Sequence, residues 1–425
     1  NSTGVGDGEK EDIVTEQMEV ESSESVGNIE AKLIAFNTFV ESLDLPLNKI
    51  EPKLVGDGMR IGTCATEDLE VGDAYISLPA NSVIDVTTAL AGVDDKSSDF
   101  ASLLRKYSEL NTPYNDGFDM LLLYLLHERF LLKEQSRWWP YLDLLPSIEE
   151  LSTFHPLFFE EEEMNRYLAG SDVRGFILRY QQRAADRYAA LSSDLDANLV
   201  LGSDVLLDKE KVYWATAIID SRSIWWGGKR HISPLLDLVN ADSQGAAHET
   251  KLEDSEDVNQ KLAVTRASRH VGKGEQVFEN YAQPNYLLFA YHGFLLEDNA
   301  NDCALLDGLF IRRNDPGAKS AHLLRSRTPT FCIRDLASIE ELAHFLRVKH
   351  GLASGNSSAA NLDDDVRPLL IDLLEGRVAR LMEAMSNDVD KETFALPRLN
   401  LMRQMVKNDL MHFQHALKTH VLVQN

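Results

Sequence analysis

The sequence predicts an α+β fold, because strand-like and helical patterns alternate in long blocks along its 425 residues. A first β pattern is followed by a helical stretch, then by a second β pattern, and finally by further helices. This order differs from the regular βαβ repetition of a doubly wound nucleotide-binding fold, which is therefore disfavoured. Because a chain of this length exceeds what one hydrophobic core usually supports, we expect two or three domains.

The N-terminal region contains an acidic tail, a helix and the first β pattern. Residues 1–28 are rich in acidic residues, Ser and Gly and lack aromatic residues, so a disordered tail is expected. Apolar residues at helical spacing predict an amphipathic helix over residues 29–45. Residues 59–79 predict two short strands with a turn at Gly72 between them.

The remaining elements follow in the same way from periodicity. Helical spacing from Phe100 to Val212 predicts a helical insert at about 95–215. Strand-like segments return between Ile232 and Phe278, around a polar hairpin at 242–261. Apolar residues three and four positions apart then predict three helices in the C-terminal region, at 339–352, 366–385 and 399–420.

Composition limits the possible partners. With 42 Lys and Arg residues against 68 Asp and Glu residues, the formal net charge of −26 repels phosphate backbones and anionic membranes. We therefore expect no nucleic-acid partner and no membrane partner, whereas a basic protein segment is electrostatically plausible. No apolar stretch has the length of a membrane span. The chain is expected to be a monomer.

The three cysteines are Cys64, Cys303 and Cys332. Their odd number, their wide separation and the lack of a CxxC pair indicate neither a disulfide framework nor a cysteine-rich zinc site. A reducing compartment is therefore favoured, such as the cytoplasm, the nucleus or a plastid.

Signatures of several common enzyme classes are absent from the sequence. It contains no P-loop, no GxSxG elbow and no HExxH motif, so phosphoryl transfer, serine hydrolysis and zinc peptidase chemistry lose support. His412 and His415 have a spacing that can ligate a metal on a helix, but they have no acidic or cysteine partner nearby in sequence. We expect no metal site.

Several segments share their order with the motifs of a known family. They are RIGTCATEDLEVGD (60–73), SRWWPYLDLLP (136–146), SRSIWW (221–226), SPLLDLVNAD (233–242), GKGEQVFENYAQPN (272–285) and YHGFLLEDN (291–299). Together they resemble the SET-domain protein methyltransferases, and more narrowly the branch that contains the Rubisco large-subunit lysine methyltransferase and the actin-histidine methyltransferase. The resemblance extends over about residues 30–425.

The resemblance implies a fold and a domain organisation. It implies a SET-type irregular β fold with a pseudoknot over residues 29–298, interrupted by the helical insert, and an all-helical substrate-binding domain over 299–425. It also implies S-adenosylmethionine as cofactor and a protein as substrate.

The resemblance also assigns site residues. Those expected to bind the cofactor are Met59, Arg60, Gly62, Arg222, Asp237, Asn240, Ala241 and Tyr281. Several of them have a plainer alternative: a turn or bulge for Gly62, a surface ion pair for Arg222, and a buried structural pair for Asp237 and Asn240. We favour cofactor contact for Asn240, and hold a structural role equally good for Asp237.

Tyr281 matches the catalytic tyrosine of the family. Methyl transfer is an in-line displacement, so an enzyme mainly has to align the acceptor lone pair with the methyl carbon. A tyrosine hydroxyl can orient the acceptor nitrogen, and the position of Tyr281 after a Gly-Glu strand favours this role over that of a core tyrosine with a satisfied hydroxyl. No metal is required.

The sequence also departs from the family pattern. Ala241 stands where the family has a histidine, and His292-Gly293-Phe294 stands where lysine-methylating relatives have Tyr-Gly-Phe, with Tyr291 shifted by one place. Ile224, Tyr291 and His292 are the expected substrate-binding residues. In this branch, the position two after the arginine is an aromatic residue in the Rubisco-type lysine enzyme and an amide in the actin-histidine enzyme. Because the apolar Ile224 cannot hydrogen-bond an imidazole, the resemblance favours lysine over histidine as the acceptor.

Three functions remain open from the sequence. The first is an S-adenosylmethionine-dependent protein-lysine N-methyltransferase, with a protein-histidine N-methyltransferase of the actin type as its alternative. The second, motivated by Ala241 and His292, is a catalytically inactive SET-fold adaptor that binds a protein partner. The third, a helical scaffold without a cofactor, is disfavoured by the irregular β segments around Asp237 and Gly274. The acceptor protein and the number of methyl groups transferred cannot be read from the sequence.

Overall fold

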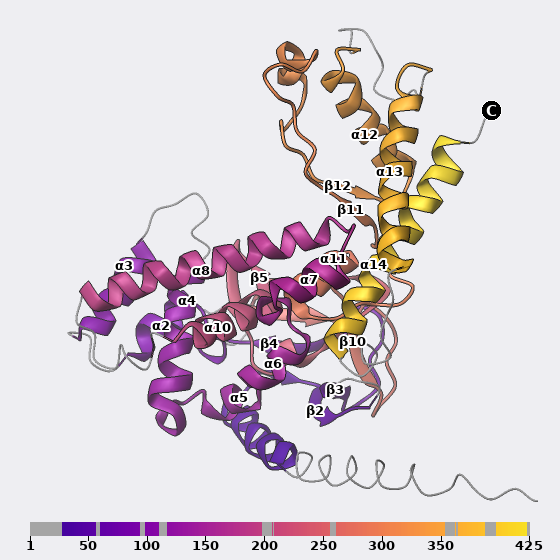
Figure 1. Ribbon diagram of the computed structural model, residues 1–425. Helices are drawn as coiled ribbons and strands as arrows, with labels where there is room; N and C mark the ends of the chain where they lie inside the picture. The colour runs from indigo at the N-terminus through magenta and orange to yellow at the C-terminus, as the bar shows by residue number, and fades with distance from the viewer. Residues whose placement is uncertain are drawn as a thin grey trace, which may run out of the picture. The chain divides into compact units, whose positions relative to one another are not determined.

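The computed structural model describes residues 28–56, 60–93, 98–109, 117–197, 208–255, 261–352, 364–386 and 397–422, together with Leu206 and Leu362 (Figure 1). Residues 1–27, which make up nearly all of the predicted acidic tail, lie outside the described residues. Met59, an expected cofactor-binding residue, also lies outside them.

The chain divides into two compact units, each built from separate segments. Unit 1 comprises Asn1–Pro146, Leu195–Leu206 and Arg222–Asn280, and unit 2 comprises Ser147–Asp194, Leu207–Ser221 and Tyr281–Asn425. The predicted helical insert therefore contributes to both units. The domain limits at 29–298 and 299–425 stay a prediction.

Two four-stranded sheets form the β part of unit 1. The first has the order β1-β4-β9-β8, and the second has the order β2-β3-β10-β7. Their bounds are Leu47–Asn48 (β1), Ile50–Leu54 (β2), Ile61–Ala65 (β3), Ala74–Leu78 (β4), Asn240–Ala247 (β7), Thr250–Asp254 (β8), Lys261–Arg266 (β9) and Gln276–Asn280 (β10). The predicted strands at 59–79 are confirmed as β3 and β4, and Gly72 in the connecting turn has a φ of +91°.

One pairing in unit 1 differs from the rest. β10 pairs in parallel with β7, and Phe278 lies opposite Asn240 while Glu279 lies opposite Ala241. The other strand pairs of these two sheets are antiparallel. The parallel pair brings the SPLLDLVNAD segment beside the strand that ends directly before Tyr281.

A separate hairpin follows Arg222. β5 (Ser223–Trp226) and β6 (Lys229–Ile232) are antiparallel, and both residues of the two-residue turn between them, Gly227 and Gly228, have positive φ. Glycine permits this conformation, which matches the twist of a hairpin.

The helices of unit 1 start with residues 28–42, close to the predicted 29–45. Phe36 is fully buried in this helix and contacts the ring of Tyr141, with 6.1 Å between centroids. The other helices are α2 (Val86–Gly92), α3 (Asp99–Glu109), α4 (Phe118–Leu126) and α5 (Trp139–Leu144). Because α4 is apolar all round, it lies in the core; each of its residues except Asp119 is buried.

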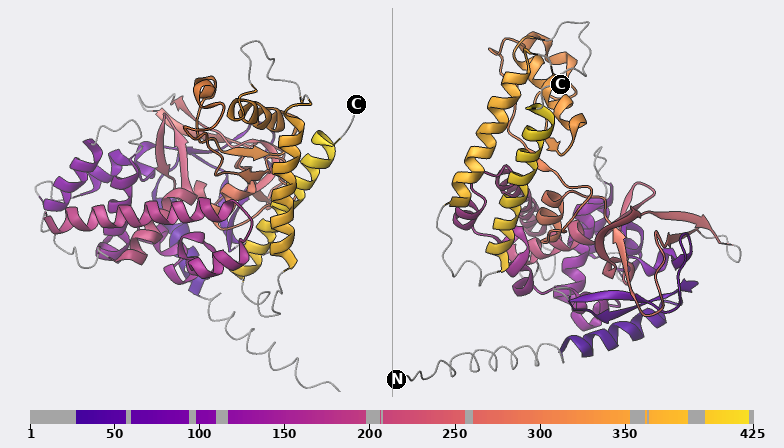
Figure 2. Two further views of the ribbon diagram at one scale, coloured as in Figure 1. Left: turned by 45° about the horizontal axis from the view of Figure 1, so that its top comes forward. Right: turned by 90° about the vertical axis from the view of Figure 1, so that its right-hand side faces the viewer.

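Unit 2 is mainly helical. Its helices are α6 (Ile148–Phe154), α7 (Glu161–Tyr167), α8 (Val173–Ala197), α10 (Lys209–Arg222), α11 (Asn285–His292), α12 (Leu336–Lys349), α13 (Arg367–Ser386) and α14 (Pro397–Ala416). The last three confirm the predicted C-terminal helices, and α13 and α14 lie side by side (Figures 1 and 2). A cluster of apolar residues from these helices forms the core of the unit. In the part of the chain that the structure describes, no helix has the length and apolar character needed to cross a membrane.

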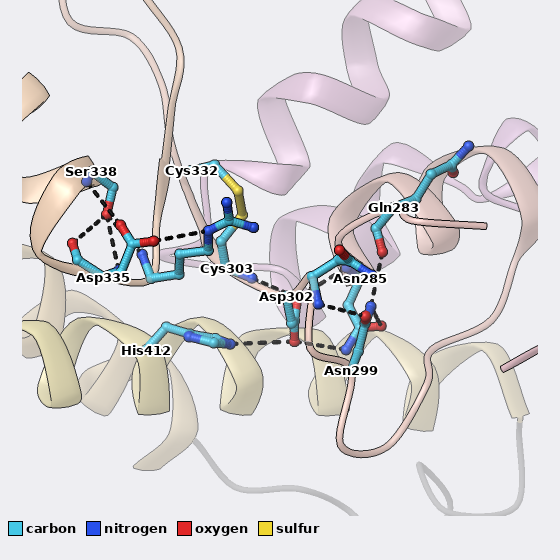
Figure 3. The surroundings of a disulfide bond; sticks show 11 residues. Gln283, Asn285, Asn299, Asp302, Cys303, Cys332, Asp335, Ser338 and His412 are labelled. Carbon is cyan, nitrogen blue, oxygen red and sulfur yellow. Dashed lines mark hydrogen bonds and ion pairs between the residues drawn. A yellow bond between two sulfur atoms is a disulfide. The ribbon is translucent and has the colours of Figure 1, made fainter. Parts of the chain in front are cut away.

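Two expectations for the C-terminal region were wrong. The region is not all helical, because β11 (Ala304–Leu306) pairs with β12 (Phe331–Ile333). Cys303 and Cys332 also form a disulfide beside this pair, with 5.2 Å between their Cα atoms (Figure 3). The two cysteines are 29 positions apart, so only the strand pairing brings them together. A reducing compartment was expected because the cysteine pattern indicated no disulfide, and this disulfide removes that support.

Candidate active site

Asn240 and Gly62 come together in the second sheet of unit 1. Asn240 Nδ2 donates a hydrogen bond to the carbonyl oxygen of Ile61, at 3.1 Å, across the intervening strand β10. A Cβ atom on residue 62 would lie 2.8 Å from Asn240 Nδ2 and 2.5 Å from Gln276 Nε2. Glycine therefore leaves room here for the close approach of two amide side chains, rather than serving a turn.

Arg222 and Asp237 form an ion pair at the end of α10. Arg222 Nη1 donates to the backbone oxygen of Asp237 at 3.0 Å and to its Oδ2 at 3.4 Å. The Asp237 side chain is fully buried, whereas 21% of the Arg222 side chain is exposed. The Tyr141 hydroxyl also donates to Asp237 Oδ2. The pair is therefore anchored in the core and is not a surface ion pair.

Burial controls the ionisation of this group. Burial raises the pKa of Asp237, although Arg222 and the Tyr141 hydroxyl act in the opposite direction. Burial and the neighbouring carboxylate hold the pKa of Tyr141 well above its ordinary value, so Tyr141 stays a hydrogen-bond donor. Asp237 Oδ1 is buried without a hydrogen-bond partner from another described residue. This oxygen could accept a further donor, such as a ligand group.

The remaining expected residues of unit 1 lie in or beside strands. Arg60 donates through Nη1 to the carbonyl oxygen of Leu144, at 2.9 Å, directly before β3. Ala241 is buried in β7 opposite Glu279. Ile224 is half-buried in β5, two residues after Arg222 and opposite His231.

Tyr281, Tyr291 and His292 belong to unit 2. The Tyr281 ring contacts the ring of His292, with 5.4 Å between centroids, and the His292 ring contacts that of Phe294 at 5.8 Å. The structure thus brings together Tyr281 and the histidine that replaces the family tyrosine. His292 is the last residue of α11, and its ring packs back on the residue that follows β10.

Tyr291 lies in a different aromatic group. Its ring is perpendicular to that of Tyr180, with 5.1 Å between centroids, and its carbonyl oxygen is 3.0 Å from Nε2 of His155. Burial lowers the pKa of His155 to about 4, so this imidazole is neutral at pH 7. Successive residues of a helix point in different directions, which explains why Tyr291 and His292 have different neighbours.

A second polar cluster in unit 1 received no role from the sequence. Glu279 is buried on β10, accepts a hydrogen bond from the Tyr75 hydroxyl and forms an ion pair with His248. These three residues line a cavity of about 260 Å³. In the sequence, Glu279 could have indicated this cluster, because it is an acidic residue in an otherwise apolar strand pattern, immediately before Asn280 and Tyr281.

The described residues contain no group of three His, Cys, Asp or Glu side chains that could hold a metal ion. The expected site residues instead offer two kinds of chemistry. Amide and guanidinium donors beside strand β3 and hairpin β5–β6 can bind a polar ligand. Tyr281 and His292 offer a hydroxyl and an imidazole.

Comparisons with known proteins agree with this description. No family model matches the chain. N-lysine methyltransferase SETD6 of Bos taurus is 26% identical over 298 residues, which cover 66% of this chain and 61% of the relative. The actin-histidine N-methyltransferase of Danio rerio is 28% identical over 252 residues, covering 57% of this chain and 38% of the relative.

Solved structures match over more of the chain. Rubisco LSMT bound to AdoMet aligns with a TM-score of 0.64 and 18% identity over 90% of both chains. The SET domain of LSMT bound to MeLysine and AdoHcy aligns with a TM-score of 0.66 over the same shares. The predicted resemblance to the SET-domain protein methyltransferases is confirmed, and the chain has their α+β fold.

Proposed function

We propose that this chain is an S-adenosylmethionine-dependent protein N-methyltransferase with lysine as its acceptor. The observation that carries the proposal is the contact of Asn240 with the Ile61–Gly62 strand, because it places a side-chain amide beside the backbone of this buried strand, where the resemblance expects the cofactor. The Bos taurus relative is named as a lysine methyltransferase, and the LSMT structure is described as bound to AdoMet.

The residues present fit such a cofactor. Its carboxylate needs a cationic partner, and Arg222 offers a partly exposed guanidinium that Asp237 holds in place. Its ammonium group needs an acceptor, and the buried Asp237 Oδ1 lacks a partner from the other described residues. Asn240, Arg60 and the Gly62 backbone would hold the rest, together with Ala241.

When bound, S-adenosylmethionine supplies an electrophilic methyl group on a sulfonium. In the proposed reaction Tyr281 orients the acceptor nitrogen so that its lone pair points along the line of displacement. His292, in contact with the Tyr281 ring, restricts the orientation of that ring. Ile224 in unit 1 and His292 in unit 2 stay the proposed acceptor-side residues, whereas Tyr291 packs against Tyr180. The acceptor amine has to be neutral to act as a nucleophile.

Lysine is favoured over histidine because of Ile224. A histidine acceptor needs a hydrogen-bonding group that fixes one imidazole nitrogen, and the Ile224 side chain has none. Since a relative named as an actin-histidine methyltransferase has similar identity, the acceptor should be tested directly. The net charge of −26 favours encounter with a basic segment of the substrate protein.

Calorimetric titration tests the proposal. The chain should bind S-adenosylmethionine and its demethylated product saturably, and Asn240→Ala should weaken both. The matched control is Asn165→Ala, which removes an exposed amide on α7 that accepts a hydrogen bond from Arg174. Well-folded protein without any binding would refute the enzyme and favour the adaptor. Binding without transfer to lysine or histidine peptides would also favour the adaptor.

A further inference from the structure

A network of polar side chains lies beside Gln283 and the start of α11, just after Tyr281 in the sequence (Figure 3). The segment runs from Tyr281 to the start of α11 at Asn285, and Ala282 has a φ of +53°, a conformation that is unfavourable for a residue with a Cβ atom. Such a conformation persists only where surrounding contacts enforce it. Directly after Ala282, the chain is held by hydrogen bonds of Asn285, Asn299 and Asp302, all in unit 2.

The side chain of Asn285 is completely satisfied. Its Oδ1 accepts from the backbone nitrogen of Leu296 at 3.0 Å and from Asn299 Nδ2 at 3.2 Å. Its Nδ2 donates to the carbonyl oxygen of Leu296 at 3.0 Å and to Asp302 Oδ2 at 2.7 Å. Only 3% of the residue is exposed. This set of partners fixes both the orientation of the amide and the start of α11.

Asp302 accepts from four donors. Its Oδ1 accepts from the backbone nitrogen of Asn285 at 2.9 Å and from that of Cys303 at 2.8 Å. Its Oδ2 accepts from Asn285 Nδ2 and lies 3.3 Å from Nε2 of His412. The carboxylate thus caps the N-terminus of α11 from a distant part of the chain, where the dipole of the helix favours a negative charge.

The network also reaches the turn after Tyr281. Asn299 Nδ2 donates to the carbonyl oxygen of Gln283 at 2.9 Å, and the backbone nitrogen of Asp302 donates to the carbonyl oxygen of Asn299. The other end of α11 is held as well. Gly293 has a φ of +76°, and a Cβ atom there would lie 2.6 Å from the Phe154 ring. His292 is therefore the last residue of a helix that is fixed at both ends, and Tyr281 lies four residues before its first residue.

We propose that Asp302 is a positioning residue, which acts through Asn285 and Asn299 to hold Tyr281 in the orientation that methyl transfer needs. The inference rests on the proposed function, because it assigns Tyr281 a role in that reaction. The hydrogen bonds of Asp302 described above join it to neither Tyr281 nor His292. Its effect should therefore appear in the turnover rate and not in cofactor affinity.

Asp302→Asn is the sharpest variant. Both carboxylate oxygens accept hydrogen bonds, so either orientation of an amide would direct an NH₂ group at existing donors. Asp335→Asn is the matched control: Asp335 also caps a helix in unit 2, accepting from the Ser338 nitrogen at 2.9 Å, but it belongs to α12. Asn299→Ala serves as a second, milder variant, since Asn299 is only half-buried.

Two measurements separate positioning from folding. The first is turnover on a lysine peptide array together with calorimetric affinity for S-adenosylmethionine. The second is the ¹⁹F spectrum of 3-fluorotyrosine placed at position 281. Asp302→Asn and Asn299→Ala should lower turnover about ten- to a hundredfold, as small misplacements of a reacting group do. Cofactor affinity should be unchanged, and the fluorine resonance should shift or split.

The outcomes distinguish this inference from the proposed function. If the unaltered chain binds no cofactor, the proposed function fails, and the fluorine spectrum still decides whether Asp302 positions Tyr281. If folded Asp302→Asn and Asn299→Ala both leave the fluorine resonance and turnover as in the unaltered chain, Asp302 is not a positioning residue. Equal changes in Asp335→Asn would also overturn the inference, because they would show a general loss of stability. If Asp302→Asn does not fold, Asn299→Ala decides in the same way.

Discussion

The contacts around Asp237 in unit 1 and around Asp302 in unit 2 differ in how completely each carboxylate is satisfied. Asp302 uses both oxygens and accepts from two backbone nitrogens, an amide and His412. Asp237 uses Oδ2 for Tyr141 and Arg222, and its buried Oδ1 has no partner from another described residue.

The ionisation of the two groups follows from this difference. Burial raises the pKa of both carboxyls, but around Asp302 the hydrogen bonds from His412 and from the backbone of Asn285 and Cys303 outweigh burial and lower the pKa. Around Asp237 burial outweighs its partners. A carboxylate with all its hydrogen bonds made fixes structure, whereas a buried oxygen without a partner carries a desolvation cost.

The largest expected effect on stability comes from removing the Asp302 carboxylate, whose two oxygens both accept hydrogen bonds. Asp302→Ala should lower the free energy of unfolding by about 3–5 kcal/mol, because it leaves several buried donors and a histidine without their partner. Urea denaturation measures this change. Asp335→Ala, which removes an exposed helix cap, should cost only about 1 kcal/mol. Equal costs for the two variants would contradict the central position of Asp302 in its network.

The disulfide next to Asp302 gives the second prediction. Reduction of Cys303–Cys332 should lower the free energy of unfolding by about 2–4 kcal/mol, since the bond restricts the unfolded chain over a sequence separation of 29 residues. Thermal unfolding with and without dithiothreitol measures the effect. The Cys303→Ala/Cys332→Ala double variant should show no response to the reductant. A response of the same size in that variant would assign the effect to another group.

Asp409 extends the comparison of Asp237 with Asp302, because it is a third buried aspartate and has few hydrogen-bond partners. Burial raises its pKa to about 8, and Ser171 Oγ donates to its Oδ2 at 2.5 Å. Above pH 4 the unfolded chain releases this proton while the folded chain retains it. The free energy of unfolding should therefore fall as the pH rises from about 4 to about 8, and then level off.

Asp409→Asn removes this dependence. The variant should gain stability over the unaltered chain as the pH rises, reaching about 1–3 kcal/mol at pH 8. Urea denaturation at pH 5, 6, 7 and 8 measures the difference. Asp302 should act with the opposite sign: its pKa is lowered, so its contribution is present above about pH 4 and is lost below it. A constant difference between Asp409→Asn and the unaltered chain would refute the neutral buried form of Asp409.

The smallest expected effect concerns the approach of Asn240 to strand β3. Gly62→Ala should cost about 1 kcal/mol of stability, because the ends of the Gln276 and Asn240 side chains have to move. Cofactor affinity should fall more clearly than stability, since Asn240 is displaced. Calorimetry and urea denaturation measure the two quantities. Gly56→Ala is the control, because a Cβ atom there meets no other atom within 4 Å.

Local sequence patterns predicted much of the fold. The apolar periodicity of residues 399–420 predicted α14, and the strand pattern around Gly62 predicted β3, because these signals depend on neighbours in sequence. The order of the motifs predicted the SET-type fold. The same patterns missed β11 and β12, which are three residues each and too short to give a clear period.

The sequence by itself determined which residue types the candidate site contains, including Asn240, Arg222 and Tyr281, and the order in which they occur. Only the tertiary structure decided their partners. The anchoring of Arg222 on Asp237, the Cys303–Cys332 disulfide and the four donors around Asp302 each join residues that are distant or unpatterned in sequence. Their physical reason is the same: a buried polar or sulfur atom takes its partner from whichever strand or helix the packing places beside it, and that choice leaves no local pattern.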